Sequence, residues 1–539
     1  MCGNFIDRCI ILFGALGVLS LCQAGDGYIR LNAAIHCDTQ ISGGKHSPET
    51  MAEFFSAQKL DAAFITDHDH VSAEYGIFPF RNALKYRHHR PSIHTLGAAR
   101  YLDTIRAIDQ QTPGVIIFPG IEAVPFYHWE GSFVSNNLRL KNWHRHVLVL
   151  GLNRAGDVDA LPSPLNNRFG PYSGVKIIIG VAGLIGLIVA LGCFVRMHRA
   201  NKAKASAGTA LRVVNHRAYP NFITPQGQVK SHFRDELPYS FRIVKRQQPG
   251  DGRRKWAGIV LKISMVGCVL AVLAGYPWKA TKYSLYSGDY GAGPYQDLID
   301  YVNEKQGLTF WAHPEAHYHS SEWSIDVETL PYPELLLQTF NYTGFAIFWE
   351  GMHHVGRPGG IWDMVLNQYC LGKRDRPVWA IGELDFEEQD DPRMLRETLT
   401  PVWAKERSAA AIMDALGAGR MYATRNFAAD FIHLETFALS DANAGCVAIS
   451  GQEYSGAFPP EIRISLTLTQ PGTYHLELIR NGQAIRRFEP NGQGNWTIAF
   501  RDGDIPAGRK SYYRFLIYRN NWAVLASNPI FASDPSADH

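Results

Sequence analysis

Histidine and carboxylate side chains recur at the ends of short apolar segments throughout this chain of 539 residues. The candidate metal ligands are His36, Asp38, His68, Glu122, His146, His313, Asp385 and Glu387. Imidazole nitrogens and carboxylate oxygens suit divalent ions such as Mn, Zn or Fe. Two or three such ions, about 3.5–4 Å apart, would lower the pKa of a bound water and clamp a phosphoryl oxygen. The residue types therefore indicate a multinuclear metal centre that activates water.

The spacing suggests individual roles. His36 and Asp38 are two residues apart, so on a strand they would share one face and grip one ion while Cys37 points away. Glu122 follows a Pro-Gly-Ile turn, and its carboxylate could bridge two ions, whereas an imidazole normally binds one. Asp67, next to His68, would orient a ligand or accept a proton from metal-bound water. Asp67 and Glu122 are therefore the candidate catalytic residues.

The elements that position these residues follow from the apolar segments. Short apolar runs bounded by turn formers occupy 62–65, 115–118, 309–311 and 378–381, and another precedes His36. Such runs are typical of buried parallel strands. Successive parallel strands present their carboxyl ends at one mouth of a barrel. A lone His or Asp beside such a strand is more often a buried or capping residue than a ligand, but the ordered set favours a metal centre.

The longer motifs resemble a known family. The segments 36–44, 47–49 and 59–68 resemble the opening of metallohydrolases of the PHP (polymerase and histidinol phosphatase) superfamily. The segments 119–122, 146–151, 311–314, 362–366 and 382–385 are similar to its later motifs. The resemblance covers about 30–155 and 290–425, and implies a distorted (β/α)7 barrel and metal-dependent hydrolysis, often of phosphoesters. The extracytoplasmic branches that include carbaryl-type hydrolases look closest, because 419–424 and 527–531 also match them.

The chain departs from the pattern of this family in three places. The usual opening His-x-His has Asp38 as its second member, and the usual closing Asp-x-His has Glu387. The usual Ser-Asp-Gly reads Ser42-Gly43-Gly44, which removes a carboxylate that often serves a third ion. His46 either substitutes for it or is a surface-loop histidine. Carboxylates in place of imidazoles favour harder cations such as Mn or Mg over Zn. The alternative is an eroded, inactive barrel.

Charge and hydropathy indicate a membrane protein. Residues 196–255 carry fourteen Lys or Arg against three Asp or Glu, although the whole chain is only +3, which suggests no nucleic-acid partner. Apolar segments at 175–195 and 256–278 flank this basic loop, and each is long enough to span a bilayer. Buried core helices are the alternative. The basic loop would stay in the cytoplasm by the positive-inside tendency.

Residues 1–24 have the charged start, short apolar core and small-residue end of a secretory signal, with an uncleaved anchor as the alternative. The barrel segments 28–155 and 288–428 would then lie together outside the cytoplasm, on the periplasmic or extracellular side of the inner membrane. Residues 429–539 alternate apolar and polar side chains, and Asn481-Gly482 and Asn491-Gly492 are typical of hairpin turns. This pattern predicts a β-sandwich, either packed on the barrel or binding substrate or glycan.

The expected fold is therefore α/β: a distorted (β/α)7 barrel interrupted by a two-helix transmembrane insertion, followed by a β-sandwich. The expected function is that of a membrane-anchored, extracytoplasmic, metal-dependent hydrolase, a phosphoesterase in the first instance, acting on a small-molecule ester or phosphoester. Its partners would be the lipid bilayer and an unknown cytoplasmic protein at the basic loop. The rival hypothesis is a catalytically silent sensor that binds a ligand outside and signals through that loop. Turnover distinguishes the two.

Overall fold

The computed structural model describes residues 27–77, 81, 85–133, 135–164, 174–207, 251–275, 282–322, 325–427, 432–441, 447–490, 492–506 and 508–533. The expected signal segment and most of the basic loop lie outside these residues. The chain divides into two compact units, one comprising Met1–Phe169 with Thr281–His539 and the other Gly170–Ala280. The domain boundaries expected from the sequence stay predictions.

The larger unit is α/β and contains a series of seven hydrogen-bonded strands. Their order is β1 (Ile29–Cys37), β2 (Ala62–Ile65), β5 (Ile116–Ala123), β8 (Val147–Leu150), β9 (Leu308–Trp311), β12 (Gly344–Ala346) and β13 (Trp379–Ile381). After Gly382 the chain continues as β14 (Glu383–Phe386), which pairs in parallel with β1. The last strand of the series is therefore followed by a strand that pairs with β1, the first.

One strand of this series runs against the sequence-based expectation of parallel strands. β8 is antiparallel to both β5 and β9, whereas the pairs among the other strands of the series are parallel. The amino end of β8 consequently lies at the same edge as the carboxyl ends of its neighbours. His146 precedes β8, so the reversed direction brings its side chain to the edge reached by the residues that follow the other strands.

Helices lie between these strands along the chain. The longer ones are α1 (Pro48–Ala57), α3 (Ala98–Gln111), α7 (Gly293–Glu304), α9 (Ile361–Cys370) and α10 (Ala409–Ala418). α1 begins at Ser47, whose hydroxyl accepts a hydrogen bond from the Thr50 N–H and so satisfies a donor that the helix leaves free. Its buried face carries Met51 and Phe55. Burying each of these large side chains contributes roughly 1.5–3 kcal/mol.

The larger unit also contains short helices and strands that were not predicted from the sequence. The helical ones are α2 (Ile93–Leu96), α4 (Ala155–Val158), α8 (Leu335–Gln338), a π-helical turn at Met352–Gly356 and a 3-10 turn at Pro392–Arg396. The strands are β3 (Ser72–Gly76), β4 (Lys85–His89), β6 (His128–Glu130), β7 (Arg139–Lys141), β10 (Tyr318–Glu322) and β11 (Ile325–Thr329). They pair as the hairpin β3–β4 and as a separate sheet in the order β10-β11-β7-β6.

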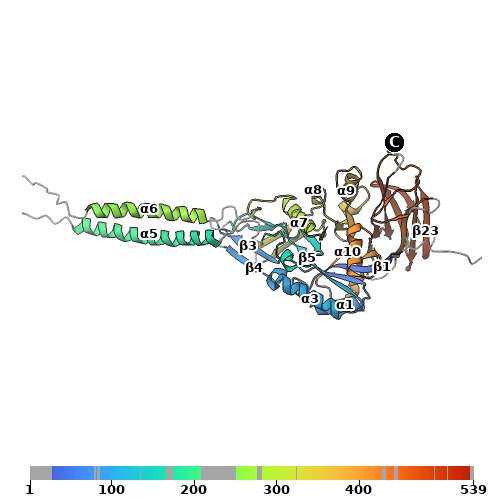
Figure 1. The fold of residues 1–539 in the computed structure, drawn as a ribbon, viewed down its shortest axis with the longest axis horizontal. Helices are drawn as coiled ribbons and strands as arrows, with labels where there is room; N and C mark the ends of the chain where they lie inside the picture. The colour runs from blue at the N-terminus through green and yellow to red at the C-terminus, as the bar shows by residue number, and fades with distance from the viewer. Residues whose placement is uncertain are drawn as a thin grey trace, which may run out of the picture. The chain divides into compact units, whose positions relative to one another are not determined.

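The β-rich C-terminal region expected from the alternating pattern is present (Figure 1). One of its sheets continues the central series through β15 (Thr398–Ala404), β16 (Tyr422–Arg425), β25 (Trp522–Ser527), β24 (Ser511–Arg519), β21 (Tyr474–Arg480) and β22 (Gln483–Phe488), with β26 (Ile530–Ala532) and β19 (Glu453–Tyr454) beside it. The second sheet consists of β18 (Val447–Ile449), β17 (Ile432–Ser440), β20 (Glu461–Leu468) and β23 (Gly494–Arg501). Side chains of both sheets, such as Leu434 and Phe515, share one core.

The predicted turn at Asn481-Gly482 joins β21 to β22, and both residues have positive φ, 51° and 89°, as a two-residue hairpin of this type requires. Asn491 of the second predicted turn lies outside the described residues.

The C-terminal region is attached to the central strands by buried polar contacts. Asn528 donates hydrogen bonds to the carbonyl oxygens of Ala380 and Met421 and accepts one from the Ala380 N–H.

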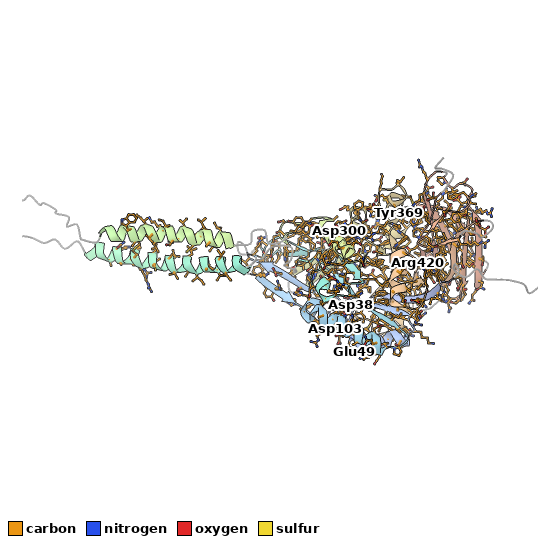
Figure 2. The ribbon with its side chains drawn as sticks, in the orientation of Figure 1. Asp38, Glu49, Asp103, Asp300, Tyr369 and Arg420 are labelled. Atoms are coloured by element: carbon orange, nitrogen blue, oxygen red, sulfur yellow. The ribbon has the colours of Figure 1, made fainter. Side chains whose placement is uncertain are left out.

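The smaller unit is a helical hairpin of α5 (Gly174–Ala207) and α6 (Asp251–Gly275), which run side by side in Figure 1. Gly183 and Gly186 face α6: a Cβ at Gly183 would lie 2.8 Å from the Val272 nitrogen, and one at Gly186 would lie 2.7 Å from the Cys268 sulfur. Glycine therefore permits the close approach of these helices. Many apolar side chains of both helices are exposed, and Figure 2 shows them projecting outward. Both helices are long and apolar enough to cross a membrane.

Candidate metal centre

Glu122 lies at the centre of the candidate site. β5 presents this side chain at the edge where the carboxyl ends of the strands meet, and only 2% of the residue is exposed. Its Oε2 lies 3.1 Å from Nε2 of His36 and 3.1 Å from Nε2 of His68. Its Oε1 contacts Nδ1 of His146 and lies 3.4 Å from Nε2 of His313. Imidazoles on both oxygens are the arrangement that a bridging carboxylate requires.

The ligand atoms converge in three overlapping sets. Within each set the donor atoms lie within 4.8 Å of one another, and the sets are His68, Glu122 and His146; His36, Asp38 and Glu122; and Asp38, His68 and Glu387. Glu122, Asp38 and His68 each belong to two sets. Shared ligands are characteristic of adjoining ions rather than of one isolated ion. Six of the eight ligands expected from the sequence are thus brought together.

Asp38 provides a test of whether the site fits a cation. The residue is buried, and neither carboxylate oxygen has a hydrogen-bond partner within the described part of the chain. Burial, together with the negative charge of Glu122, raises the pKa of Asp38 well above its ordinary value. A buried carboxylate without partners is costly unless a cation or a proton neutralises it. A metal ion at this position would supply the missing partner, so the donor set fits a divalent ion. Figure 2 labels Asp38 among the packed side chains of the larger unit.

Glu383 is a functional residue that the sequence analysis did not single out. Its Oε1 accepts a hydrogen bond from Nδ1 of His36, and its Oε2 accepts one from the His313 N–H at 3.1 Å. Burial raises the pKa of Glu383, but the positive charge that His36 can carry opposes burial and leaves the pKa below its ordinary value. A carboxylate on the outer nitrogen of a ligating imidazole fixes the tautomer and the ring orientation. Its spacing, two residues before Asp385, was the available signal.

Asp67 is hydrogen-bonded to the loop that follows Asp38. Its Oδ1 accepts hydrogen bonds from the Thr39 N–H at 2.9 Å and from the Ser42 hydroxyl at 2.7 Å, and its Oδ2 accepts one from the Thr39 hydroxyl. Asp67 belongs to none of the three ligand sets. Burial raises its pKa to about 6, against the opposing effect of these hydrogen bonds. The carboxylate therefore holds the loop that follows Asp38 and acts on the site through that loop.

Two glycines of the same loop lie against candidate ligands, and a close contact requires glycine at position 44. A Cβ on Gly44 would lie 2.4 Å from the Asp38 carbonyl oxygen, which no real side chain tolerates, and one on Gly43 would lie 3.4 Å from Oε1 of Glu387. The loop thus packs directly on two candidate ligands. His46 does not replace the missing carboxylate: its Nε2 lies 3.0 Å from the Gln389 carbonyl oxygen, outside the three ligand sets.

His313 and Asp385 lie at the margin of the cluster. Neither belongs to a three-residue set, but Oδ1 of Asp385 lies 3.7 Å from Nε2 of His36. The side chain of Asp385 is 49% exposed, so it faces solvent as well as the cluster. Burial, and then the charge of Asp385, raise the pKa of the neighbouring Glu387 to about 7.

Three of these residues have a backbone conformation that L-amino acids rarely adopt. The φ angles are 73° at His36, 25° at His313 and 53° at Asp385. Each such residue costs on the order of 1–3 kcal/mol, and strain of this kind concentrates at functional sites. Strain in three residues around one carboxylate indicates that the geometry of the cluster, rather than stability alone, determines the backbone here.

A cleft of about 260 Å³ opens beside the cluster. Its lining residues are His313, Phe348, Trp349, Glu350, Glu383, Leu384, Asp385, Phe386, Gln389, Met394 and Glu397. A larger cavity, of about 870 Å³, borders the beginning of β5 and the residues just before β9 and contains no candidate ligand. Size alone would favour the larger cavity as the substrate site, but the smaller cleft adjoins the candidate metal ligands.

No family model and no curated protein sequence matches this chain. Among solved structures, it is similar to a two-domain protein from Bacteroides vulgatus containing a predicted PHP-like metal-dependent phosphoesterase, with 13% identity, 94% of this chain and 96% of that chain covered, and a TM-score of 0.31. A candidate metal-dependent phosphoesterase from Bifidobacterium adolescentis has 13% identity, coverage of 66% and 87%, and a TM-score of 0.26.

An amidohydrolase from Chromobacterium violaceum, whose structure contains sulfate and no metal, has 14% identity, coverage of 67% and 88%, and a TM-score of 0.21. Similarity at this level identifies neither the family nor the activity of the chain. The arrangement of the His and carboxylate side chains must support the functional assignment.

Proposed function

We propose that this protein is a metal-dependent hydrolase of ester bonds, phosphoesters foremost, with a centre of two or three divalent ions. The observation that carries the proposal is the contact of one buried carboxylate, Glu122, with imidazoles on both of its oxygens, beside the unpartnered carboxylate of Asp38. Bound ions would lower the pKa of a bound water, and their positive charge would stabilise the oxygens of the scissile ester.

The residues of the chain have distinct roles in this proposal. Glu122 would bridge two ions, and Asp38 and His68 would link neighbouring positions because each belongs to two ligand sets. Glu383 orients His36 through its Nδ1. Asp385, exposed to the cleft and near His36, is placed to accept a proton from water or substrate. Carboxylate-rich ligation favours Mn over Zn.

We propose further that the strand series closed by β14 is the distorted (β/α)7 barrel that the PHP resemblance implies, and that the C-terminal sheets form a β-sandwich. β14 follows β13 at one end of the series and pairs with β1 at the other end, which supports the barrel. The shared core of the two C-terminal sheets supports the β-sandwich. The branch that includes carbaryl-type hydrolases remains the nearest one by sequence motif.

We also propose that α5 and α6 anchor the protein in the inner membrane, with the metal centre outside the cytoplasm. The exposed apolar side chains of both helices support a lipid environment. Glu122 precedes the hairpin in sequence and His313 follows it, yet the two side chains meet at 3.4 Å. Both flanking segments must therefore lie on one side of a membrane, which two crossings provide. The basic residues between the helices favour a cytoplasmic loop.

Hydrolysis assays on the purified full-length protein test the proposal. The panel would contain bis-(p-nitrophenyl) phosphate, p-nitrophenyl phosphate and p-nitrophenyl acetate, before and after chelation and after addition of Mn, Fe or Zn. We expect turnover of at least one phosphoester that chelation abolishes and Mn restores best. Stoichiometric metal without turnover of any substrate would replace the hydrolase with the silent-sensor hypothesis.

A further inference from the structure

The cleft beside the metal centre has a composition that the hydrolytic chemistry alone does not explain. Its lining residues contain carboxylates and aromatic rings but neither Lys nor Arg. Glu383 and Asp385 already contact His36 in the cluster. Glu350 and Glu397 also line the cleft, and neither belongs to one of the three ligand sets.

Glu397 is the most informative of these residues. It is 8% exposed, and within the described part of the chain its carboxylate makes no hydrogen bond or ion pair. Burial raises its pKa, and the charge of Arg425 only partly opposes this effect. The carboxylate oxygens of Glu397 could accept hydrogen bonds from a donor bound in the cleft, or attract a bound cation. Glu350, by contrast, is exposed at the same cleft.

The aromatic wall of the cleft is held in a fixed position. Trp349 has a φ of 65°, is 48% exposed, and donates its indole N–H to the Thr398 hydroxyl at 3.2 Å. The guanidinium of Arg425 lies 3.9 Å from the ring centroid of Trp349 and steadies it. Phe348 and Phe386 complete the apolar lining. Aromatic rings are a recognised environment for organic cations, and neighbouring carboxylates add favourable negative charge.

We propose that this cleft binds an organic cation, an ammonium group carried by the alcohol portion of the substrate ester. The substrate class would then be phosphoesters of cationic alcohols, and this refinement rests on the proposed hydrolase function. An anionic group in the same position would meet Glu350 and Glu397 without a compensating Lys or Arg in the lining and would be repelled.

A matched pair of substrates tests this specificity. p-Nitrophenyl phosphocholine carries a trimethylammonium group, and p-nitrophenyl 3,3-dimethylbutyl phosphate carries an uncharged group of the same shape. We expect kcat/KM to be at least about ten-fold higher for the cationic ester. Glu397→Gln should reduce this ratio several-fold, whereas Glu53→Gln, at an exposed position on α1, should leave the ratio unchanged. Equal kcat/KM for both esters would overturn the inference.

Binding without turnover separates this inference from the proposed function. Calorimetric titration of the full-length protein with choline chloride, in a choline-free detergent, should show binding that Glu397→Gln weakens. Because Glu397 is buried, Glu350→Gln provides a second variant at an exposed position and should also weaken binding. Choline binding without hydrolysis of either ester would contradict the hydrolase and support the cation site. Absence of choline binding, or equal binding by wild type and both variants, would refute the cation site.

Discussion

Asp38 shows how a single residue constrains the chemistry of the site. An imidazole at this position would be neutral, whereas the carboxylate of Asp38 brings negative charge into a buried cluster that already contains Glu122. Glu387 is a second carboxylate, and it shares one ligand set with Asp38. Each additional anionic ligand reduces the Lewis acidity of a bound ion and raises the pKa of its water. The identity of these two residues should therefore determine metal preference and pH dependence.

The double variant Asp38→His with Glu387→His tests this consequence. Restoring imidazoles should shift the preferred ion from Mn toward Zn and move the pH–rate profile of hydrolysis to lower pH. The measurement is kcat/KM with each metal between pH 5.5 and pH 9, a range chosen to span the ordinary pKa of metal-bound water at about 7. Asp103→His, at an exposed position on α3, is the control. Zinc-optimal activity in the wild type, with no shift in the double variant, would contradict the prediction.

Asp67 should leave a signature in the pH dependence of stability. Its pKa is about 6 in the folded protein, raised by burial from 3.8, so the folded state binds a proton more tightly than the unfolded state. The contribution of Asp67 to stability therefore increases as the pH falls from 7 to 4. Asp67→Asn lacks this ionisation, and the free energy of unfolding of wild type relative to the variant should rise by about 2 kcal/mol over that range. Denaturant unfolding of metal-free protein measures the difference.

If the difference between wild type and Asp67→Asn were independent of pH, the raised pKa would be wrong. Glu53→Gln, which removes an exposed carboxylate from α1, is the matched control and should show little change.

The sequence predicts most of the clustered side chains but not the residues that support them. His36, Asp38, His68, Glu122 and His146 are recognisable because side chains that bind metals stand beside apolar runs. The spacing of Glu383 from Asp385 indicates a candidate residue, but its contact with His36 joins residues 347 positions apart and is visible only in the fold. The hydrogen bonds that occupy Asp67 are likewise visible only in three dimensions.

At the scale of elements, the apolar runs predicted the strands but not their directions. β8 is antiparallel to both of its neighbours, β5 and β9, whereas parallel strands were expected. Direction depends on connection length and path, which composition does not encode. β12 (Gly344–Ala346) was not among the predicted strands.

A buried ion pair joins the C-terminal strands to α9. The guanidinium of Arg514 donates hydrogen bonds to both carboxylate oxygens of Asp363, at 2.7 Å and 2.6 Å, and the Tyr512 hydroxyl also contacts that carboxylate. The side chains of Asp363 and Arg514 are 1% and 0% exposed. Asp363→Ala would leave a buried cation without a partner, which costs about 3–5 kcal/mol.

Thermal unfolding of the Asp363→Ala variant should therefore begin well below that of the wild type. The double variant Asp363→Ala with Arg514→Met should recover part of the loss, because no unpaired charge remains. A loss below about 1 kcal/mol in the single variant, the range of surface pairs, would show that the pair does not secure this contact. Arg463→Ala, which removes a more exposed pair with Glu461, is the control.

For the whole molecule, the main constraint is that the helical hairpin lies, in sequence, between two segments whose side chains meet in one cluster. Segments before α5 and after α6 supply candidate ligands to the same cluster. The start of α5 and the end of α6 must therefore lie on the same side of any membrane that the helices cross. The apolar segments and the charge of the intervening loop were evident from the sequence alone. The meeting of Glu122 with His313 required the fold.

Reporter fusions test the topology. Alkaline phosphatase, which is active only outside the cytoplasm, should be active when fused after Gly151 or at the C-terminus and inactive when fused after Gln226. A cytoplasmic fluorescent reporter at Gln226 should give the complementary signal. An active phosphatase at Gln226 would contradict the two-crossing arrangement.

Metal content is the most direct test of the central claim that Glu122 bridges adjoining ions. Mass spectrometric metal analysis of purified full-length protein should find at least two transition-metal ions per chain, as the shared ligand sets imply. Glu122→Gln should lose more metal than Asp385→Asn, because Glu122 belongs to two ligand sets whereas Asp385 belongs to none. Glu53→Gln should retain the wild-type content. One ion or none in the wild type, or unchanged metal content in Glu122→Gln, would contradict the bridged centre.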